Sequence, residues 1–269
     1  MTAKSPYVIH PYDQPFYSPA HHTGTRNYRL VGPPTNGSQF LEIALGDIER
    51  NEGAPAHAHP DLEQAVYIID GEATVAIDGV VEDVKTGDLL YYPPHVFHDI
   101  KVKSERIKLL VIYAPPFLEA PKIHHDASHT GVQDFTPTGK SPYVIHPYEQ
   151  SFYSPANHTG TRNYRLVGPP TNGSKYLEIA LGDIERHEGS PAHAHPDLEQ
   201  AVYVIEGEAS VGIDGIVSEV KTGDLLFFPP HVFHDIKVKS ERIKLLVIYS
   251  PPFLEAPVMH LTTAHAEVN

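Results

Sequence analysis

The sequence predicts an all-β protein that contains the same domain twice, and three observations lead to this prediction. Residues 4–121 and 140–257 align without a gap and differ at only 17 of 118 positions. Each copy consists of short runs rich in β-branched and aromatic residues, separated by glycine and proline. No segment carries a sustained apolar spacing of about 3.6 residues, which an amphipathic helix would show. Each copy is also long enough to bury a core of its own.

The strands are expected at regular intervals along each copy. Asp78-Gly79 lies between two of them and is a strong signal for a two-residue hairpin turn. Gly87 and Pro93-Pro94 interrupt the chain again. Six or seven short strands with tight turns indicate an antiparallel sandwich or a small barrel. In the first copy we expect strands at residues 40–48, 64–69, 73–77, 80–85, 89–92, 97–102 and 107–113.

The repeat also sets the expected domain boundaries. We expect an N-terminal domain at residues 1–121, a linker at 122–139, a C-terminal domain at 140–257 and a tail at 258–269. The strand pattern and the duplication together predict that the two domains pack as an intrachain pseudo-dimer. Whether this unit forms a further homo-oligomer is left open by the sequence.

Composition and charge exclude several classes of protein. The chain has 34 Asp and Glu against 20 Lys and Arg, and no Lys/Arg-rich block, so nucleic-acid binding is not expected. The absence of cysteine excludes disulfides, thiolate metal ligands and a thiol nucleophile. The first residues lack the apolar stretch of a secretory signal, and Pro115-Pro116 interrupts the longest apolar run. We therefore expect a soluble, cytoplasmic protein with no membrane partner.

Each copy carries a group of histidines that predicts a metal site. The first copy reads His57-Ala58-His59, then Glu63-Gln64, and later His98. Spaced imidazoles with a carboxylate or an amide nearby are typical metal ligands. On the expected strand at 97–102, His98 shares its face with apolar residues and should point inwards, whereas Asp99 lies on the opposite face. Both faces of the strand that begins at Gln64 are apolar, so this alternation does not choose between Gln64 and Glu63.

These residues resemble the cupin superfamily, and the duplication resembles its bicupin branch. Two positions depart from the family pattern: three residues rather than five separate Gly53 from His57, and His95 stands where a glycine is usual. The resemblance implies two double-stranded β-helix (jelly-roll) barrels, each with a divalent metal ion. It also implies an N-terminal arm that pairs with a neighbouring sheet, for which the proline-rich residues 4–19 are suited. The matching positions are Gly53, His57, His59, Gln64 and Gly71 in the first motif, and Gly87, Pro93 and His98 in the second.

The resemblance implies a set of four ligands in each half. The acidic or amide ligand of the family usually stands seven positions before the closing glycine, and Gln64 is seven positions before Gly71. Glu63 is eight positions before it and remains the alternative, as does Glu199 in the second half. We expect two metal ions per chain, each Mn, Ni, Zn or Fe. The predicted ligands are His57, His59, Gln64 and His98 in the first half, and His193, His195, Gln200 and His234 in the second.

The neutral ligand set favours one class of chemistry. Three imidazoles and an amide leave the +2 charge of the metal ion uncompensated, which suits a small carboxylate or carbonyl substrate. We expect an enzyme that uses the metal ion as a Lewis acid, of the lyase, isomerase or decarboxylase type. The alternatives are an Fe(II)-dependent dioxygenase and a non-catalytic module that binds a small ligand. The candidate substrate-binding residues are Arg29, Arg165, Tyr67 and Tyr203.

Overall fold

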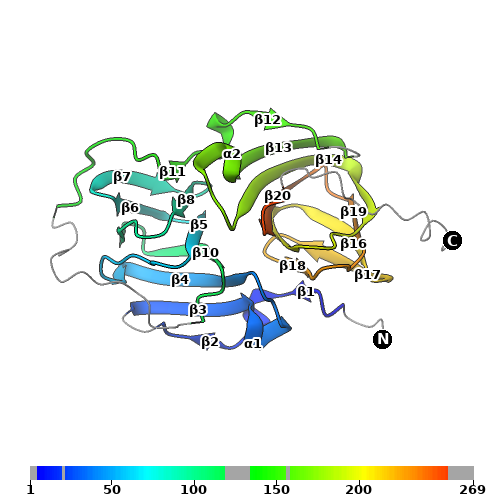
Figure 1. Ribbon diagram of the computed structural model, residues 1–269, viewed down its shortest axis with the longest axis horizontal. Coiled ribbons are helices and arrows are strands. Elements are labelled where there is room, and N and C mark those ends of the chain that lie inside the picture. Colours follow the sequence, from blue (N-terminus) through cyan, green and yellow to red (C-terminus); the bar gives the residue numbers. More distant parts are fainter. Residues whose placement is uncertain (1–4, 20–21, 119–133, 156–157, 254–269) are drawn as a thin grey trace. The chain divides into compact units, whose positions relative to one another are not determined.

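The computed structural model describes residues 5–19, 22–118, 134–155 and 158–253. Within these ranges nearly all regular structure is β-strand, so the predicted all-β class is confirmed (Figure 1). No helix in the described ranges is long and apolar enough to cross a membrane. The helical segments are single turns: η1 (Pro11–Asp13), α1 (Pro33–Asn36), η2 (Pro147–Glu149) and α2 (Pro169–Asn172).

One compact unit comprises residues 14–149. Its strands form a seven-stranded sheet in the order β11-β8-β5-β10-β4-β3-β2 and a three-stranded sheet in the order β7-β6-β9, with antiparallel pairing throughout. A single bridge between His57 and His98 links the segment after β4 to β9. The strands are β2 (Phe16–Tyr17), β3 (Thr23–Val31), β4 (Glu42–Gly53), β5 (Glu63–Asp70), β6 (Glu72–Ile77), β7 (Val80–Lys85), β8 (Leu89–Tyr92), β9 (His98–Val102), β10 (Arg106–Ala114) and β11 (Val144–Ile145).

The other unit comprises residues 1–13 and 150–269. Its strands form one ten-stranded sheet because β14 continues as far as His193 and pairs with β20, β13 and β19. The order of pairing otherwise repeats that of the first unit. The strands are β1 (Val8–Ile9), β12 (Phe152–Tyr153), β13 (Thr159–Val167), β14 (Glu178–His193), β15 (Glu199–Glu206), β16 (Glu208–Ile213), β17 (Ile216–Lys221), β18 (Leu225–Phe228), β19 (His234–Val238) and β20 (Arg242–Ser250).

The first strand of each repeat belongs to the unit that the other repeat forms. β1 pairs with β18, and β11 pairs with β8, so the expected pairing of the N-terminal arm with a neighbouring sheet is confirmed. A histidine fastens each arm to the sheet it joins. His10 Nδ1 lies 2.6 Å from Asp224 Oδ1, and His146 Nδ1 lies 2.7 Å from Asp88 Oδ1. These two histidines therefore serve the fold.

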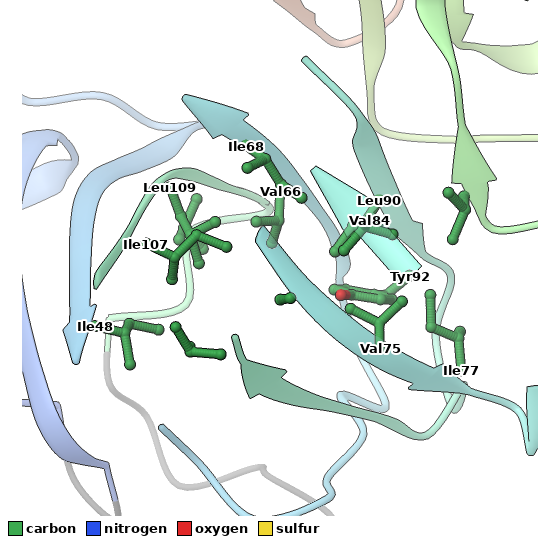
Figure 2. Packing of buried hydrophobic residues seen from close by; sticks show 14 residues of the cluster. Ile48, Val66, Ile68, Val75, Ile77, Val84, Leu90, Tyr92, Ile107 and Leu109 are labelled. Atoms are coloured by element: carbon green, nitrogen blue, oxygen red, sulfur yellow. The ribbon is translucent and has the colours of Figure 1, made fainter. Parts of the chain in front are cut away.

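Alternate residues of the strands fill the interior of each barrel. In the first unit Ile68, Val75, Ile77 and Ile107 are fully buried in one cluster, which also includes Tyr92 (Figure 2). The second unit repeats this cluster with equivalent residues. The alternation of apolar residues in the sequence therefore identifies the inward face of these strands. The interior that these residues fill adjoins the histidines described below.

A motif glycine holds the start of β6 close to β10, which leads to a stability prediction. Gly71 has φ of 107°, and a Cβ there would lie 2.8 Å from the Arg106 carbonyl oxygen. Gly71→Ala should therefore lower the free energy of unfolding by about 2–4 kcal/mol, measured by urea denaturation. Gly87→Ala is the matched control, because Gly87 has φ of 95° but open space where a Cβ would stand. It should lose only about 1–2 kcal/mol, and equal losses would show that the contact with Arg106 is unimportant.

Candidate metal centres

Three histidines meet at one point inside the first barrel. His57 and His59 lie in the segment between β4 and β5, and His98 opens β9. The backbones of His57 and His98 bond to each other in both directions, with N···O distances of 3.1 and 2.9 Å. One ring nitrogen from each of the three lies within 4.8 Å of the other two. The local pairing of the backbone thus brings together residues that are about 40 positions apart in the sequence.

The second barrel repeats the same arrangement. His193 ends β14, His195 follows it, and His234 opens β19. Their nitrogen atoms also lie within 4.8 Å of one another. All three side chains are buried. The structure therefore brings together all six histidines that the sequence singled out, in two separate triads.

Backbone carbonyl groups orient the imidazole rings. His57 Nδ1 lies 2.8 Å from the Pro55 carbonyl oxygen, and His98 Nδ1 lies 3.1 Å from that of Val96. Since a carbonyl oxygen only accepts, these Nδ1 atoms carry the proton, and each Nε2 is left with a lone pair. The Nε2 of His98 is buried and has no hydrogen-bond partner. A buried acceptor of this kind is what a metal ligand requires.

Gln64 lies beside the first triad, and Glu63 does not. Gln64, on β5, lines the same cavity as His57 and His98, and its Oε1 is buried without a hydrogen-bond partner. Glu63 is buried as well, but it neither lines this cavity nor belongs to the triad group. In the second barrel Gln200 Nε2 donates to the Tyr249 hydroxyl at 3.4 Å, which leaves its Oε1 for another partner. An amide oxygen is an acceptable ligand for a divalent ion.

Aromatic rings pack against the triads and restrict their movement. Tyr92 stacks on His98, with ring centroids 3.9 Å apart and planes 6° from parallel. Phe117 packs edge-on against His59 at 5.1 Å. Both contacts recur in the second barrel, where Phe228 stacks on His234 and Phe253 packs against His195. These contacts hold the rings in one orientation and exclude water from their faces.

A small cavity adjoins each triad. Its volume is about 70 Å³ in the first barrel and about 60 Å³ in the second. Given that one water molecule needs roughly 10–15 Å³ of such space, each cavity accommodates a ligand of only a few heavy atoms. The walls of the first cavity are mainly apolar, from residues such as Ile48, Val66 and Leu109, with polar groups from Thr25 and Asn27.

The candidate arginines pair with glutamates and are not among the residues that line the cavities. Arg29 Nε donates to Glu42 Oε1 at 2.8 Å, and its guanidinium lies over the Tyr17 ring. Arg165 forms the same pair with Glu178 at 3.1 Å. Neither arginine is among the residues that line its cavity. The reason is that each buried glutamate requires a cation, and the arginine supplies it.

The candidate tyrosines do not line the cavities either. Tyr67 and Tyr203 are buried, but neither lines a cavity. Tyr67 lies three positions after Gln64 on β5, so its side chain is on the opposite face of that strand. Burial, followed by the proximity of Tyr12 and Asp224, raises the pKa of Tyr203 to about 12. Both tyrosines are therefore buried packing residues on the face of the sheet that is turned away from the cavity.

A histidine and an aspartate also line each cavity, and neither was assigned to a site from the sequence. His22 lies 6.3 Å from His57 between ring centroids, and His158 lies 6.0 Å from His193. The signal that could have identified them is their place in the repeat, directly before the strand that supplies Thr25 to the cavity. The aspartates that line the cavities are Asp99 in the first barrel and Asp235 in the second. Asp99 was expected on the opposite face because it alternates with His98, but it reaches the cavity.

Burial keeps His98, His195 and His234 neutral and ready to coordinate. It lowers the pKa of His98 and of His234 well below 6.5, and the neighbouring triad histidines add to the effect. Burial, helped by the charge of His193, lowers the pKa of His195 to about 4. A neutral imidazole is the form that binds a metal ion. These three imidazoles are therefore available as ligands well below neutral pH.

We expect the metal-free protein to lose stability as the pH falls. Because the folded pKa values lie below the unfolded value of about 6.5, the unfolded chain binds more protons below that pH. The free energy of unfolding should therefore decrease from about pH 6.5 towards 4, by up to roughly 1.4 kcal/mol per pH unit for each histidine that stays neutral. Urea unfolding over this range measures the slope. His98→Gln with His234→Gln should flatten it, and an unchanged slope would assign the effect to carboxylates.

Comparison with known proteins agrees with this architecture. A family model described as "Cupin domain" matches residues 44–113 and again residues 180–249. Quercetin 2,3-dioxygenase of Bacillus subtilis (strain 168) is 20% identical over 256 residues, which cover 80% of this chain and 75% of that protein. A variant of Bacillus subtilis oxalate decarboxylase superposes with a TM-score of 0.67 at 18% identity, over 93% of this chain and 78% of that chain.

A second solved structure shows the same likeness. Oxalate decarboxylase of Lactobacillus farciminis, in complex with formate, superposes with a TM-score of 0.67 at 14% identity, over 94% of this chain and 88% of that chain. At such identities the solved structures show a shared fold alone. The family model, by contrast, matches more than half of the sequence and places one copy over each histidine triad. The chain belongs to the cupin family, as a bicupin with one cupin domain in each half.

Proposed function

We propose that this bicupin is a divalent-metal enzyme that acts on a small carboxylate or carbonyl compound of about the size of oxalate. The reaction we propose is of the lyase type, such as decarboxylation. The observation that carries the proposal is the volume of about 60–70 Å³ beside each triad. A cavity of this size admits a ligand of a few heavy atoms, whereas larger ligands occupy pockets of roughly 300–1,000 Å³.

The donor set supports a divalent ion in each barrel. Three imidazoles and an amide oxygen are intermediate to hard donors, which suit manganese, iron, nickel or zinc. When bound, such an ion would supply a Lewis acid that polarises a substrate oxygen. The ligands we propose are His57, His59, Gln64 and His98 in the first barrel, and His193, His195, Gln200 and His234 in the second.

The other cavity residues would bind and orient the substrate. Ile48, Val66 and Leu109 present apolar surface that excludes water and lowers the local dielectric constant, which strengthens every electrostatic contact inside. Asn27 and Thr25 offer hydrogen bonds on one wall. Neither arginine nor lysine is among the described residues of the cavity walls. An anionic substrate would therefore depend on the charge of the bound ion.

A dioxygenase is the second candidate, because a sequence relative carries that activity in its name. The similarity to quercetin 2,3-dioxygenase extends over 80% of this chain. Iron or another redox-active ion in the same donor set would be compatible with such a reaction. The size of the cavity argues against a three-ring substrate such as quercetin, which would require the walls to move apart.

Two assays distinguish these proposals. Protein saturated with Mn(II) is incubated with oxalate, and formate and CO₂ are measured; these two products balance hydrogen oxalate without an external oxidant. The metal-free protein is the control. Protein saturated with Fe(II) is incubated with quercetin in an oxygen electrode. We expect metal-dependent formate release without oxygen consumption. Oxygen uptake with quercetin, and no product from oxalate or other small carboxylates, would overturn the lyase proposal.

A further inference from the structure

The residues that line the two cavities differ at two hydroxyl groups, since Tyr92 of the first is Phe228 in the second and Ala54 of the first is Ser190 in the second. Only the first of these differences lies against a triad histidine through a stacked ring. Tyr92 and its counterpart Phe228 stack in the same way on the last histidine of their triad, with ring centroids 3.9 Å apart in both cases. Both rings line their cavities. In Figure 2 the Tyr92 oxygen points into the interior, towards the side where Val66 and Leu109 line the same cavity. The first centre thus offers a hydrogen-bond donor where the second offers a bare ring.

A further difference lies on the strand that pairs with the one carrying the last triad histidine, where Gly212 on β16 replaces Ala76 on β6. A Cβ at Gly212 would overlap Oδ2 of Asp235, so a methyl group at that position excludes the carboxylate. Asp99 must therefore hold its carboxylate in another place than Asp235 does. The Tyr92 hydroxyl is a hydrogen-bond donor as well as an acceptor, so it can donate to a ligand in the cavity.

From these differences we infer that the two centres are not equivalent. The first binds an oxygen-rich ligand of the metal ion more tightly, through a hydrogen bond from Tyr92, and carries most of the turnover. The second keeps the same histidines and amide, and therefore holds its metal ion. The inference concerning turnover rests on the proposed function. One hydrogen bond to a charged ligand in a dry cavity changes binding by a factor of about ten or more.

Proteins with a single complete centre test the inference. His193→Ala with His195→Ala leaves only the first triad intact, and His57→Ala with His59→Ala leaves only the second. Each protein is loaded with Co(II), whose visible absorption responds to its ligands, and is titrated with azide. Azide is a small anion that binds open metal positions whatever the natural substrate. We expect the first centre to bind azide at least about tenfold more tightly than the second. Equal affinities would overturn the inference.

Exchange of the differing residues assigns the effect. In the first-centre protein, Tyr92→Phe should lower the azide affinity to that of the second centre. In the second-centre protein, Phe228→Tyr with Gly212→Ala should raise it. Tyr91→Phe is the matched control, because it removes a hydroxyl on the opposite face of β8 and introduces the residue that the second copy already has. If Tyr91→Phe and Tyr92→Phe weaken binding equally, packing is the cause and the inference is wrong.

Turnover is measured separately on the same single-centre proteins with oxalate. Product from the first-centre protein, with little from the second-centre protein, is the expected result. If neither forms product while the azide affinities differ as expected, the proposed reaction fails and the difference between the centres stands. If both form product at equal rates per metal ion, the inference is overturned and the proposed reaction stands.

Discussion

Replacement of His98 and His234 together by alanine should remove nearly all bound metal. Each triad would lose one of its three imidazoles, namely the backbone-oriented ring on which Tyr92 or Phe228 stacks. Inductively coupled plasma analysis should find close to two metal ions per chain in the unchanged protein and close to none in the double variant. Each single variant should retain about one, because the triads lie in separate barrels.

A matched control for this experiment is available in the same segment. His95 lies at a turn three positions before His98, is exposed, and has φ of 70°. His95→Asn with His231→Asn should leave the metal content unchanged, because asparagine tolerates this backbone conformation. Loss of metal in the control variant would show that the turn itself positions the metal ligands, through the hydrogen bond between its backbone and that of His59.

Gln64→Ala with Gln200→Ala should lower metal retention and abolish activity, whereas Glu63→Ala with Glu199→Ala should keep the metal. The amide oxygen of Gln64 is buried beside the triad without a partner, and Glu63 lies off the cavity. Loss of a fourth ligand leaves three imidazoles, which we expect to weaken affinity by at least about 100-fold. Loss of a carboxylate outside the centre acts on stability alone. Competition with a chromophoric chelator measures both affinities.

The charge of the fourth ligand gives a further comparison. Gln64→Glu with Gln200→Glu should bind the metal ion at least as tightly, because it places a negative charge beside a dication. It should also bind an anionic substrate more weakly, because the net charge of the centre falls. If the Glu63 pair releases the metal instead, the centre contains three histidines and one glutamate, and the dioxygenase proposal becomes the stronger one.

Much of the architecture was accessible from the sequence because it depends on local patterns. Alternation of apolar residues identified strands such as 80–85 and 89–92, which the structure reproduces at the same bounds. The hairpin was predicted from the Asp78-Gly79 pair, and the structure shows the positive φ values that such a turn requires at both residues. The six histidines were identified because the repeat preserves their spacing, and that spacing is a property of the chain alone.

Contacts between distant strands could not be inferred in this way. The capture of Arg29 by Glu42 depends on the pairing of β3 with β4, and the same register places His22 beside His57. Alternation assigned Asp99 to the opposite face from His98, although it reaches the cavity. Spacing along the chain favoured Gln64 over Glu63 only through the family resemblance, because both faces of that strand are apolar.

The sequence by itself determined the fold class, the duplication, and the histidines that form each triad. The tertiary structure alone decided which polar residues share the cavity with them, how large that cavity is, and how the two cavities differ. The physical reason is that strand periodicity and motif spacing act over a few residues, whereas a cavity is defined by side chains from many strands. Its volume and polarity depend on how those strands are registered against one another.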